Sequence, residues 1–176
     1  MQLEQTQKAL DAFKDFVIRQ AQHNLSKKRM RVSKELYNSL EGVAKASPNS
    51  IQLEFKMADY GVFQDKGVSG TEKKYDTPFS YKSSSNLVGL EYHTGTFASW
   101  ARFRGMQPRL KSGKYGTYKQ MGFILANSIK KKGIKPSLFF TKPFEKAFKQ
   151  LPDQIKEKFG LDLDNFLQYT INQDNK

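Results

Sequence analysis

Glu54 and Lys56 come closest to a catalytic pair in this sequence of 176 residues. They lie two apart in a strand-like stretch, so both side chains belong to one face. A carboxylate there can bind Mg²⁺ while the lysine stabilises charge beside the attacking water, as in metal-dependent nucleases. That chemistry also needs an acid on the preceding strand, and the nearest candidate, Glu41, has no Pro-Asp before it. A same-face ion pair explains both residues without catalysis, and Mg²⁺-dependent cleavage would be the sign of the nuclease alternative.

Two further catalytic patterns lack the residues that they require. A phosphate-binding loop has four residues between two glycines and a Ser or Thr after the lysine. Here Gly105 and Gly113 are too far apart, and Tyr115 follows the lysine. Ser69 and Ser112 lie in glycine-rich stretches, not on the strand-to-helix turn that presents a nucleophilic serine. The sequence therefore predicts a protein that is not an enzyme.

Metal ligands, cofactors and membrane segments are not predicted either. The chain has no cysteine, and its two histidines, His23 and His93, do not have a metal-ligand spacing. No apolar run approaches the roughly 18 residues of a membrane span. The first residues lack the basic region and apolar stretch of a signal peptide. We expect no metal, no cofactor and no membrane partner.

The distribution of positive charge is the main functional signal. The formal net charge is +13, and the window from Tyr92 to Phe144 contains eleven Lys and Arg but no Asp or Glu. Such a segment repels itself unless an anionic surface lies nearby, so nucleic acid or an acidic protein face is the expected partner. A solvated basic face is the simpler alternative. The candidate contact residues are these cations and the aromatic residues among them: Trp100, Arg102, Phe103, Arg104, Arg109, Lys111, Lys114 and Tyr115.

Hydrophobic spacing predicts an amphipathic helix over residues 3–25 and a β-hairpin over residues 35–57. In the helix apolar residues recur every three or four positions, whereas from residue 51 they alternate with polar ones. A Ser-Pro-Asn turn separates the two halves of the hairpin. The many aromatic residues indicate a small core of large rings. Between helix and hairpin, residues 26–34 are a basic connector with the composition of a nuclear-localisation or nucleic-acid patch.

The stretch ADYGVFQDKGVSG, residues 58–70, predicts a strand that leads into a short helix. Asp59 can cap that helix, and Gly67 can end it in the left-handed conformation that glycine adopts without penalty. Tyr60 and Phe63 fall on one face and are expected to anchor the turn to the core, and Asp65 is expected to cap or pair. We interpret these residues as a packing corner.

An inserted basic arm follows this corner. Residues 67–114 show no sustained period, which predicts a long loop with one short strand at residues 86–95. A helix is then predicted over residues 115–132. Lys130, Lys131 and Lys132 complement the negative end of that helix, and Gly133 ends it.

The C-terminal part is predicted to be helical. Thr141 can cap a helix with Pro143 in its first turn. Its apolar stripe continues across Pro152, which predicts a kink, and Gly160 ends it before a last short helix. The expected fold is a single α+β domain over residues 1–176: a small antiparallel sheet packed against several helices, with a long inserted arm.

This order of elements resembles the tail-completion and neck proteins of tailed bacteriophages, which form rings at the head–tail junction. Members show a short Leu-x-x-Ser strand, matched here by LYNSL at Leu36–Leu40. The corner residues match an aromatic-x-x-aromatic-x-acid-x-Gly pattern. A Pro-x-x-Phe segment before the closing helix is matched by Pro136, Phe139, Phe140 and Ala147. The likeness covers residues 30–68 and 115–160; the arm is longer than usual and the N-terminal helix is extended.

The resemblance implies a structural protein of the virion neck or tail that is made in the host cytoplasm. It implies a cyclic homo-oligomer of about six or twelve subunits that bridges portal-side or adaptor rings and tail-side rings. The basic arm would then reach a neighbouring subunit or the genomic DNA in the channel. The alternative is a nucleic-acid-binding protein that uses the acid-free segment, residues 92–144.

Overall fold

The structure, a computed structural model, describes residues 3–27, 34–81 and 95–174, with side chains as far as residue 167. The chain divides into two compact units, one formed by the parts up to Gly61 and from Leu138 onward, the other by Val62–Ser137. Helices and two-stranded antiparallel sheets build the chain, which confirms the α+β class. The second unit is wider than the predicted arm because it also contains residues 115–137. Most of the basic connector and the strand predicted at residues 86–95 lie outside the described residues.

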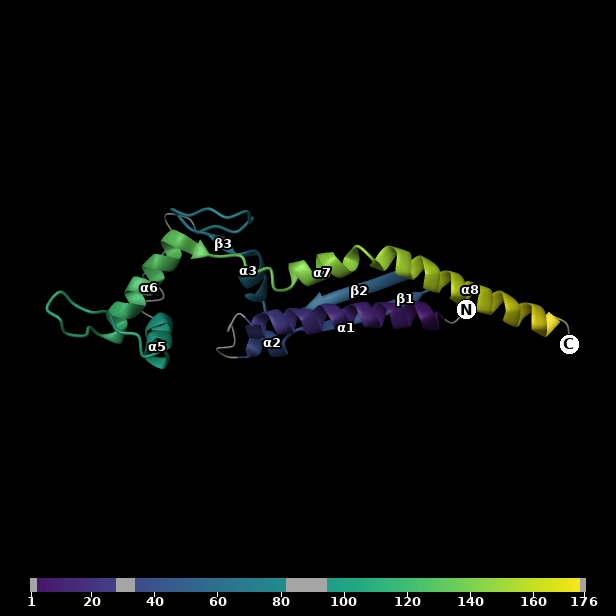
Figure 1. Ribbon diagram of the computed structural model, residues 1–176, viewed down its shortest axis with the longest axis horizontal. Coiled ribbons are helices and arrows are strands. Elements are labelled where there is room, and N and C mark those ends of the chain that lie inside the picture. The colour runs from purple at the N-terminus through teal and green to yellow at the C-terminus, as the bar shows by residue number, and fades with distance from the viewer. Residues whose placement is uncertain (1–2, 28–33, 82–94, 175–176) are drawn as a thin grey trace. The chain divides into compact units, whose positions relative to one another are not determined.

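The first unit consists of a long helix, a hairpin and two C-terminal helices (Figure 1). Helix α1 (Glu4–Lys27) packs against the hairpin of β1 (Glu41–Ser47) and β2 (Ser50–Lys56). Helices α7 (Thr141–Phe148) and α8 (Leu151–Asp174) pack along α1 and run in the opposite direction. The apolar stripe predicted in residues 3–25 is the buried face of α1. The predicted helix is therefore confirmed, and the predicted hairpin is confirmed from Glu41 onward.

The packed face of the hairpin carries small residues on β1 and large residues on β2. In its antiparallel register Gly42 pairs with Phe55 and Ala44 with Leu53. A Cβ atom at Gly42 would lie 2.8 Å from Cγ of Lys14 on α1. Because β1 carries so little side-chain volume at this point, the helix can lie directly over it.

Phenylalanine rings fill the space between the hairpin, α1 and α7. The Phe55 ring lies 6.4 Å from Phe13, 5.2 Å from Phe140 and 5.9 Å from Phe144, all in edge-to-face geometry. Such pairs each add about 0.5–1.5 kcal/mol beyond the apolar area that they bury. The predicted core of large rings is only partly correct, because Phe13 is buried but Phe55, Phe140 and Phe144 are half-buried, and most buried residues are aliphatic.

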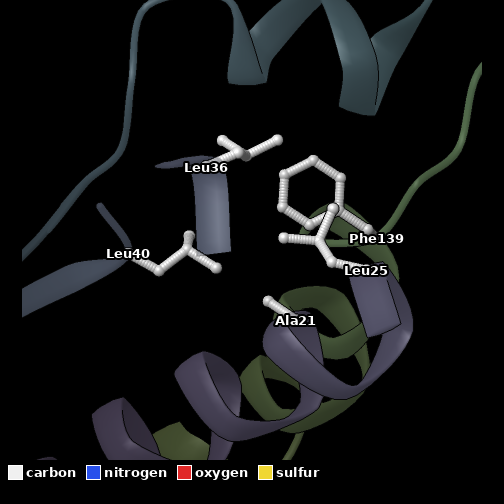
Figure 2. Close-up of a cluster of buried hydrophobic side chains, with 5 residues drawn as sticks. All are labelled: Ala21, Leu25, Leu36, Leu40 and Phe139. Atoms are coloured by element: carbon white, nitrogen blue, oxygen red, sulfur yellow. The ribbon is translucent and has the colours of Figure 1, made fainter. Parts of the chain in front are cut away.

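A second cluster closes the other end of the first unit (Figure 2). Ala21 and Leu25 of α1 meet Leu36 and Leu40, and the ring of Phe139 lies beside them with no exposed surface. Phe139 belongs to the segment that re-enters the unit just before α7. The cluster therefore joins the two chain segments that make up this unit.

Residues 36–40 do not form the predicted strand. Glu35–Asn38 is the short helix α2, in which the Asn38 amide donates to the Lys34 carbonyl at 2.9 Å. The error follows from the spacing: residues 36 and 40 share one face of a strand and also one face of a helix. The apolar spacing of this stretch fits a strand and a helix equally well, so it could not distinguish the two.

The C-terminal helices also differ from the prediction. Phe140, not Thr141, is the N-cap of α7, and no side chain caps it. The helix ends at Phe148, and no kink forms at Pro152. Pro152 is the second residue of α8, where a backbone amide would have no partner within the helix, so proline is tolerated there. Helix α8 passes through Gly160 without ending and continues to Asp174. In the described part of the chain, no helix is long and apolar enough to cross a bilayer.

The second unit begins and ends at the same place. Helix α3 (Gly61–Lys66) is followed by β3 (Val68–Ser69), which pairs antiparallel with β4 (Gly133–Ile134). The Ser137 amide donates to the carbonyls of Gln64 and Asp65 at 3.2 and 3.1 Å. The chain therefore enters and leaves this unit side by side.

Candidate interaction surface

The predicted contact residues are held in place by two helices that pack against each other through small residues. Helix α5 (Thr96–Phe103) lies against α6 (Tyr118–Lys132), with Ala101 and Ala126 fully buried between them. A Cβ atom at Gly122 would lie 2.8 Å from the amide nitrogen of Ala98. A larger residue at this position would overpack the contact. The close approach fixes the two helix ends between which the α5–α6 loop runs (Figure 1).

The α5–α6 loop is a hydrogen-bonded hairpin. The Gly116 amide donates to the Pro108 carbonyl at 2.8 Å, and the Leu110 amide donates to the Lys114 carbonyl at 2.9 Å. Arg109 and Tyr115 form an isolated β-bridge between the two sides. At its end a capping box begins α6: the Thr117 hydroxyl accepts from the Gln120 amide at 3.2 Å. Backbone hydrogen bonds thus hold this part of the predicted arm in a defined conformation, although no regular structure was expected there.

The candidate residues, apart from Trp100, gather at one end of this helix pair. We call this group the basic tip: Arg102, Phe103, Arg104, Arg109, Lys111, Lys114 and Tyr115. No Asp or Glu occurs between residues 95 and 119. Within the described part of the chain, none of the tip's cations forms an ion pair with a carboxylate. The described carboxylates therefore leave this charge unpaired.

Two of the arginines are held by aromatic rings instead. The Arg102 guanidinium lies 5.6 Å from the centre of the Tyr118 ring, and that of Arg104 lies 5.7 Å from the Trp100 ring. Trp100 is half-buried, so it positions an arginine more than it offers a surface of its own. At exposed sites such contacts are worth about 0.5–1 kcal/mol each. They reduce the freedom of two long side chains before any partner binds.

Two large rings of the basic tip are exposed. Phe103 retains 76% and Tyr115 retains 70% of its accessible surface. Aromatic residues beside arginines are the residue types that carry most of the binding energy at interfaces. The tip thus combines uncompensated positive charge with apolar anchors.

The predicted packing corner is only partly correct. Asp65 is buried, and Gly67 has a φ of 76° with its Cβ position 2.6 Å from the Ile134 carbonyl oxygen, so glycine is required there. Tyr60 and Phe63 are 39% and 42% exposed, and the prediction that they are buried anchors is wrong. The Tyr60 hydroxyl donates to Glu35 at 3.4 Å, and the Phe63 ring packs edge-to-face on Phe79 at 4.8 Å.

The Glu-x-Lys pair forms the predicted ion pair. The Lys56 ammonium lies 3.5 Å from the Glu54 carboxylate on the exposed face of the hairpin, and Glu41 is opposite Lys56 in the register. Among the described residues, no group of three or more His, Cys, Asp and Glu could hold a metal ion. Exposed pairs of this kind contribute little to stability.

Sequence reasoning missed two features of α8 because it ended that helix at Gly160. Asp162 is buried and accepts hydrogen bonds from the Thr6 hydroxyl at 2.7 Å and from the Thr6 and Gln5 amides at 2.9 and 3.1 Å. Beyond Asp162 an apolar stripe continues along the helix. Its spacing of four, seven and eight residues, starting at Phe159, was the available signal.

Comparison of the chain with protein-family models, with curated proteins and with solved structures finds no match.

Proposed function

We propose that this protein is a structural connector of a tailed bacteriophage, which forms a ring at the head–tail junction and bridges portal-side and tail-side rings. In this proposal the first unit is the body of each subunit. The second unit carries the basic tip to an anionic neighbour, either another subunit or the DNA in the channel. The protein acts by assembly and has no catalytic role.

The observation that carries the proposal is the basic tip, which has a hydrogen-bonded backbone and cations that pair with no described carboxylate. The second unit contains fourteen Lys and Arg but four Asp and Glu, so it holds ten of the thirteen excess positive charges. A chain that concentrates charge on one inserted unit gains nothing from it in isolation, because like charges destabilise the unit that carries them. The benefit has to come from a partner. In this proposal the partner is a neighbour in a connector ring, which the resemblance in residues 30–68 and 115–160 favours.

Charge reversal of the basic tip tests this proposal. We expect Arg102→Glu, Arg104→Glu and Arg109→Glu together to abolish ring-shaped assemblies seen by electron microscopy of concentrated protein. The circular dichroism spectrum and the melting temperature should stay close to those of the unaltered chain, because these side chains are exposed.

The matched control changes the same charge elsewhere. Lys142→Glu, Lys146→Glu and Lys149→Glu alter three exposed residues in and just after α7, in the first unit. This variant should still assemble. Equal loss of assembly in both variants would show that only total charge matters, and a chain that forms no rings at any concentration would contradict the proposal.

Nucleic-acid binding outside a virion is the second candidate, and the same tip favours it. Exposed aromatic rings beside arginines can stack on bases while the cations bind phosphates. In that case the monomer binds linear DNA tightly, and each phosphate contact contributes about 0.9 to the slope of log K against log salt. Replacing Arg102, Arg104 and Arg109 by Gln would lower the slope by about three. A slope unchanged by this replacement would exclude the tip as a DNA-binding surface.

A further inference from the structure

The distal half of α8 carries an apolar stripe on its surface. We call Phe159, Leu163, Phe166 and Leu167 the α8 stripe. Successive helical residues are about 100° apart, so these four share one side of the helix. Leu163 and Leu167 retain 39% and 48% of their accessible surface. This half of α8 extends past the N-terminal end of α1 in Figure 1.

The charge around the stripe is opposite to that of the basic tip. Residues 159–174 contain no Lys or Arg, in a chain that has thirty of them; of their acids, Asp162 is buried against α1, whereas Asp164 is exposed. The basic tip, in contrast, has cations and no acid, and its exposed rings are Phe103 and Tyr115. Each surface therefore offers apolar contacts and lacks the charge that the other supplies.

We propose that the basic tip of one copy docks on the α8 stripe of a second copy. The inference rests on the proposed ring and names the two surfaces that would form it. Because these surfaces differ, the contact is heterologous, and a pair of copies retains one free surface of each kind. Repetition of such a contact closes a ring when the rotation between copies permits it.

Pairing of two α8 stripes is the main competing arrangement. It would bring the acidic residues of two helices together and leave the cations of both tips unmatched. Like charges placed against each other oppose association, whereas opposite charges steer it. Such an isologous contact also ends at a dimer. Charge complementarity thus favours the heterologous contact.

Cysteine crosslinking between two different chains tests the contact directly. The protein has no cysteine, so one substitution gives one unique thiol. We would mix the full-length variants Tyr115→Cys and Leu163→Cys, add a short bis-maleimide, and identify the products by mass spectrometry. A mixed dimer joined through residues 115 and 163 is expected. It must be intermolecular, because each chain has a single thiol.

Several outcomes of this experiment would overturn the inference. Dimers joined only through two copies of residue 163 would show stripe-to-stripe pairing. A mixed-dimer yield no higher than that obtained with Ser47→Cys, an exposed residue in the hairpin, would show chance collision. Absence of any crosslinked product in concentrated protein would also contradict the proposed contact.

A matched pair of substitutions on α8 tests the contact without a crosslinker. Leu163→Lys should weaken self-association by at least about tenfold, because it removes an interface anchor and places a like charge against the basic tip. Leu161→Lys makes the same change at a residue that is 45% exposed but lies about 200° away around the helix. That control should associate like the unaltered chain. Equal weakening by both would contradict a contact through the stripe.

The two proposals fail in distinguishable ways. If the chain forms rings but residues 115 and 163 never crosslink, the proposed contact is wrong and the connector proposal stands. If residues 115 and 163 crosslink but electron microscopy shows open filaments or dimers alone, the contact stands and the ring is wrong.

Discussion

Asp162 connects α8 to the start of α1 across 156 residues of sequence. Its carboxylate accepts hydrogen bonds from two of the first amides of α1, which have no partner within the helix. Burial on its own would raise the pKa of this carboxyl group. The hydrogen bonds from Thr6 and Gln5, with the nearby charge of Lys8, outweigh burial and hold the pKa below its ordinary value. Asp162 therefore stabilises the fold as an anion.

Replacement of Asp162 by Asn tests that role. We expect Asp162→Asn to lower the free energy of unfolding by about 1–2 kcal/mol at neutral pH, the typical cost of losing a helix cap or a charged hydrogen bond. Chemical denaturation measures this change. Asp164→Asn, an exposed change two residues away, should stay within about 0.5 kcal/mol. An Asp162→Asn chain as stable as the unaltered one would show that the contact contributes nothing.

The effect of Asp162 should depend on pH in a defined direction. The folded-state pKa is lowered, and the unfolded carboxyl group titrates near pH 4. The stabilisation is therefore complete above about pH 4 and is lost as the pH falls through the folded-state pKa. In denaturation series from pH 7 downward, the difference between the unaltered chain and Asp162→Asn should shrink only below about pH 4. A difference that shrinks near neutral pH would assign the effect to another group.

Helices α6 and α8 each contain an interior glycine. The surroundings of these two glycines predict that replacement by alanine changes the free energy of unfolding in opposite directions. In a helix interior Gly→Ala stabilises by about 1 kcal/mol when the methyl group has room. At Gly160 of α8 a Cβ atom meets nothing within 4 Å, so Gly160→Ala should raise the free energy of unfolding by about that amount. At Gly122 the Cβ atom meets α5, and overpacking costs about 1–3 kcal/mol, so Gly122→Ala should destabilise.

Denaturation and hydrogen exchange of the two alanine variants check this contrast. Gly122→Ala should speed amide exchange in α5 and in the α5–α6 loop, because their packing surface is lost. Gly160→Ala should slow exchange in the distal half of α8. If both variants changed stability with the same sign, helix propensity alone would explain them and the tight α5–α6 contact would be wrong.

Elements with a strong local period were predictable, and those that tertiary contacts decide were not. The three- and four-residue spacing of α1 and the alternation in β2 belong to the sequence itself. The contact of Asp162 in α8 with Thr6 in α1 joins positions 156 residues apart, which no local window contains. Residues 36–40 and Pro152 were ambiguous because each pattern fits two conformations.

The residues of the candidate surface could be predicted from the sequence, but the backbone conformation that arranges them could not. The absence of acids between residues 92 and 144 identified the cations of the basic tip directly. Its hairpin geometry depends on backbone hydrogen bonds such as that from Gly116 to Pro108, which leave no periodic pattern. Trp100 is half-buried and holds Arg104, a pairing that the composition of the segment does not reveal.

At the scale of the whole molecule, each of the two units has buried residues of its own. Both phenylalanine-rich and leucine-rich clusters belong to the first unit, whereas Ala101, Gly122 and Ala126 organise the second. We therefore expect calorimetry to show two unfolding transitions. Asp162→Asn should shift one of them and Gly122→Ala the other, with additive effects in the double variant. A single transition shifted by both substitutions would show one cooperative unit.

The side-by-side entry and exit of the second unit has an evolutionary consequence. The amide of Ser137 reaches the carbonyls of Gln64 and Asp65, so the ends of the inserted chain are already joined by hydrogen bonds. An insertion whose two ends are adjacent can be accommodated without a change in the path of the surrounding chain. During evolution the second unit can therefore be lost, or exchanged for one with a different charge, while the first unit keeps its fold. The partner bound by the second unit and the fold of the first unit can then change at independent rates.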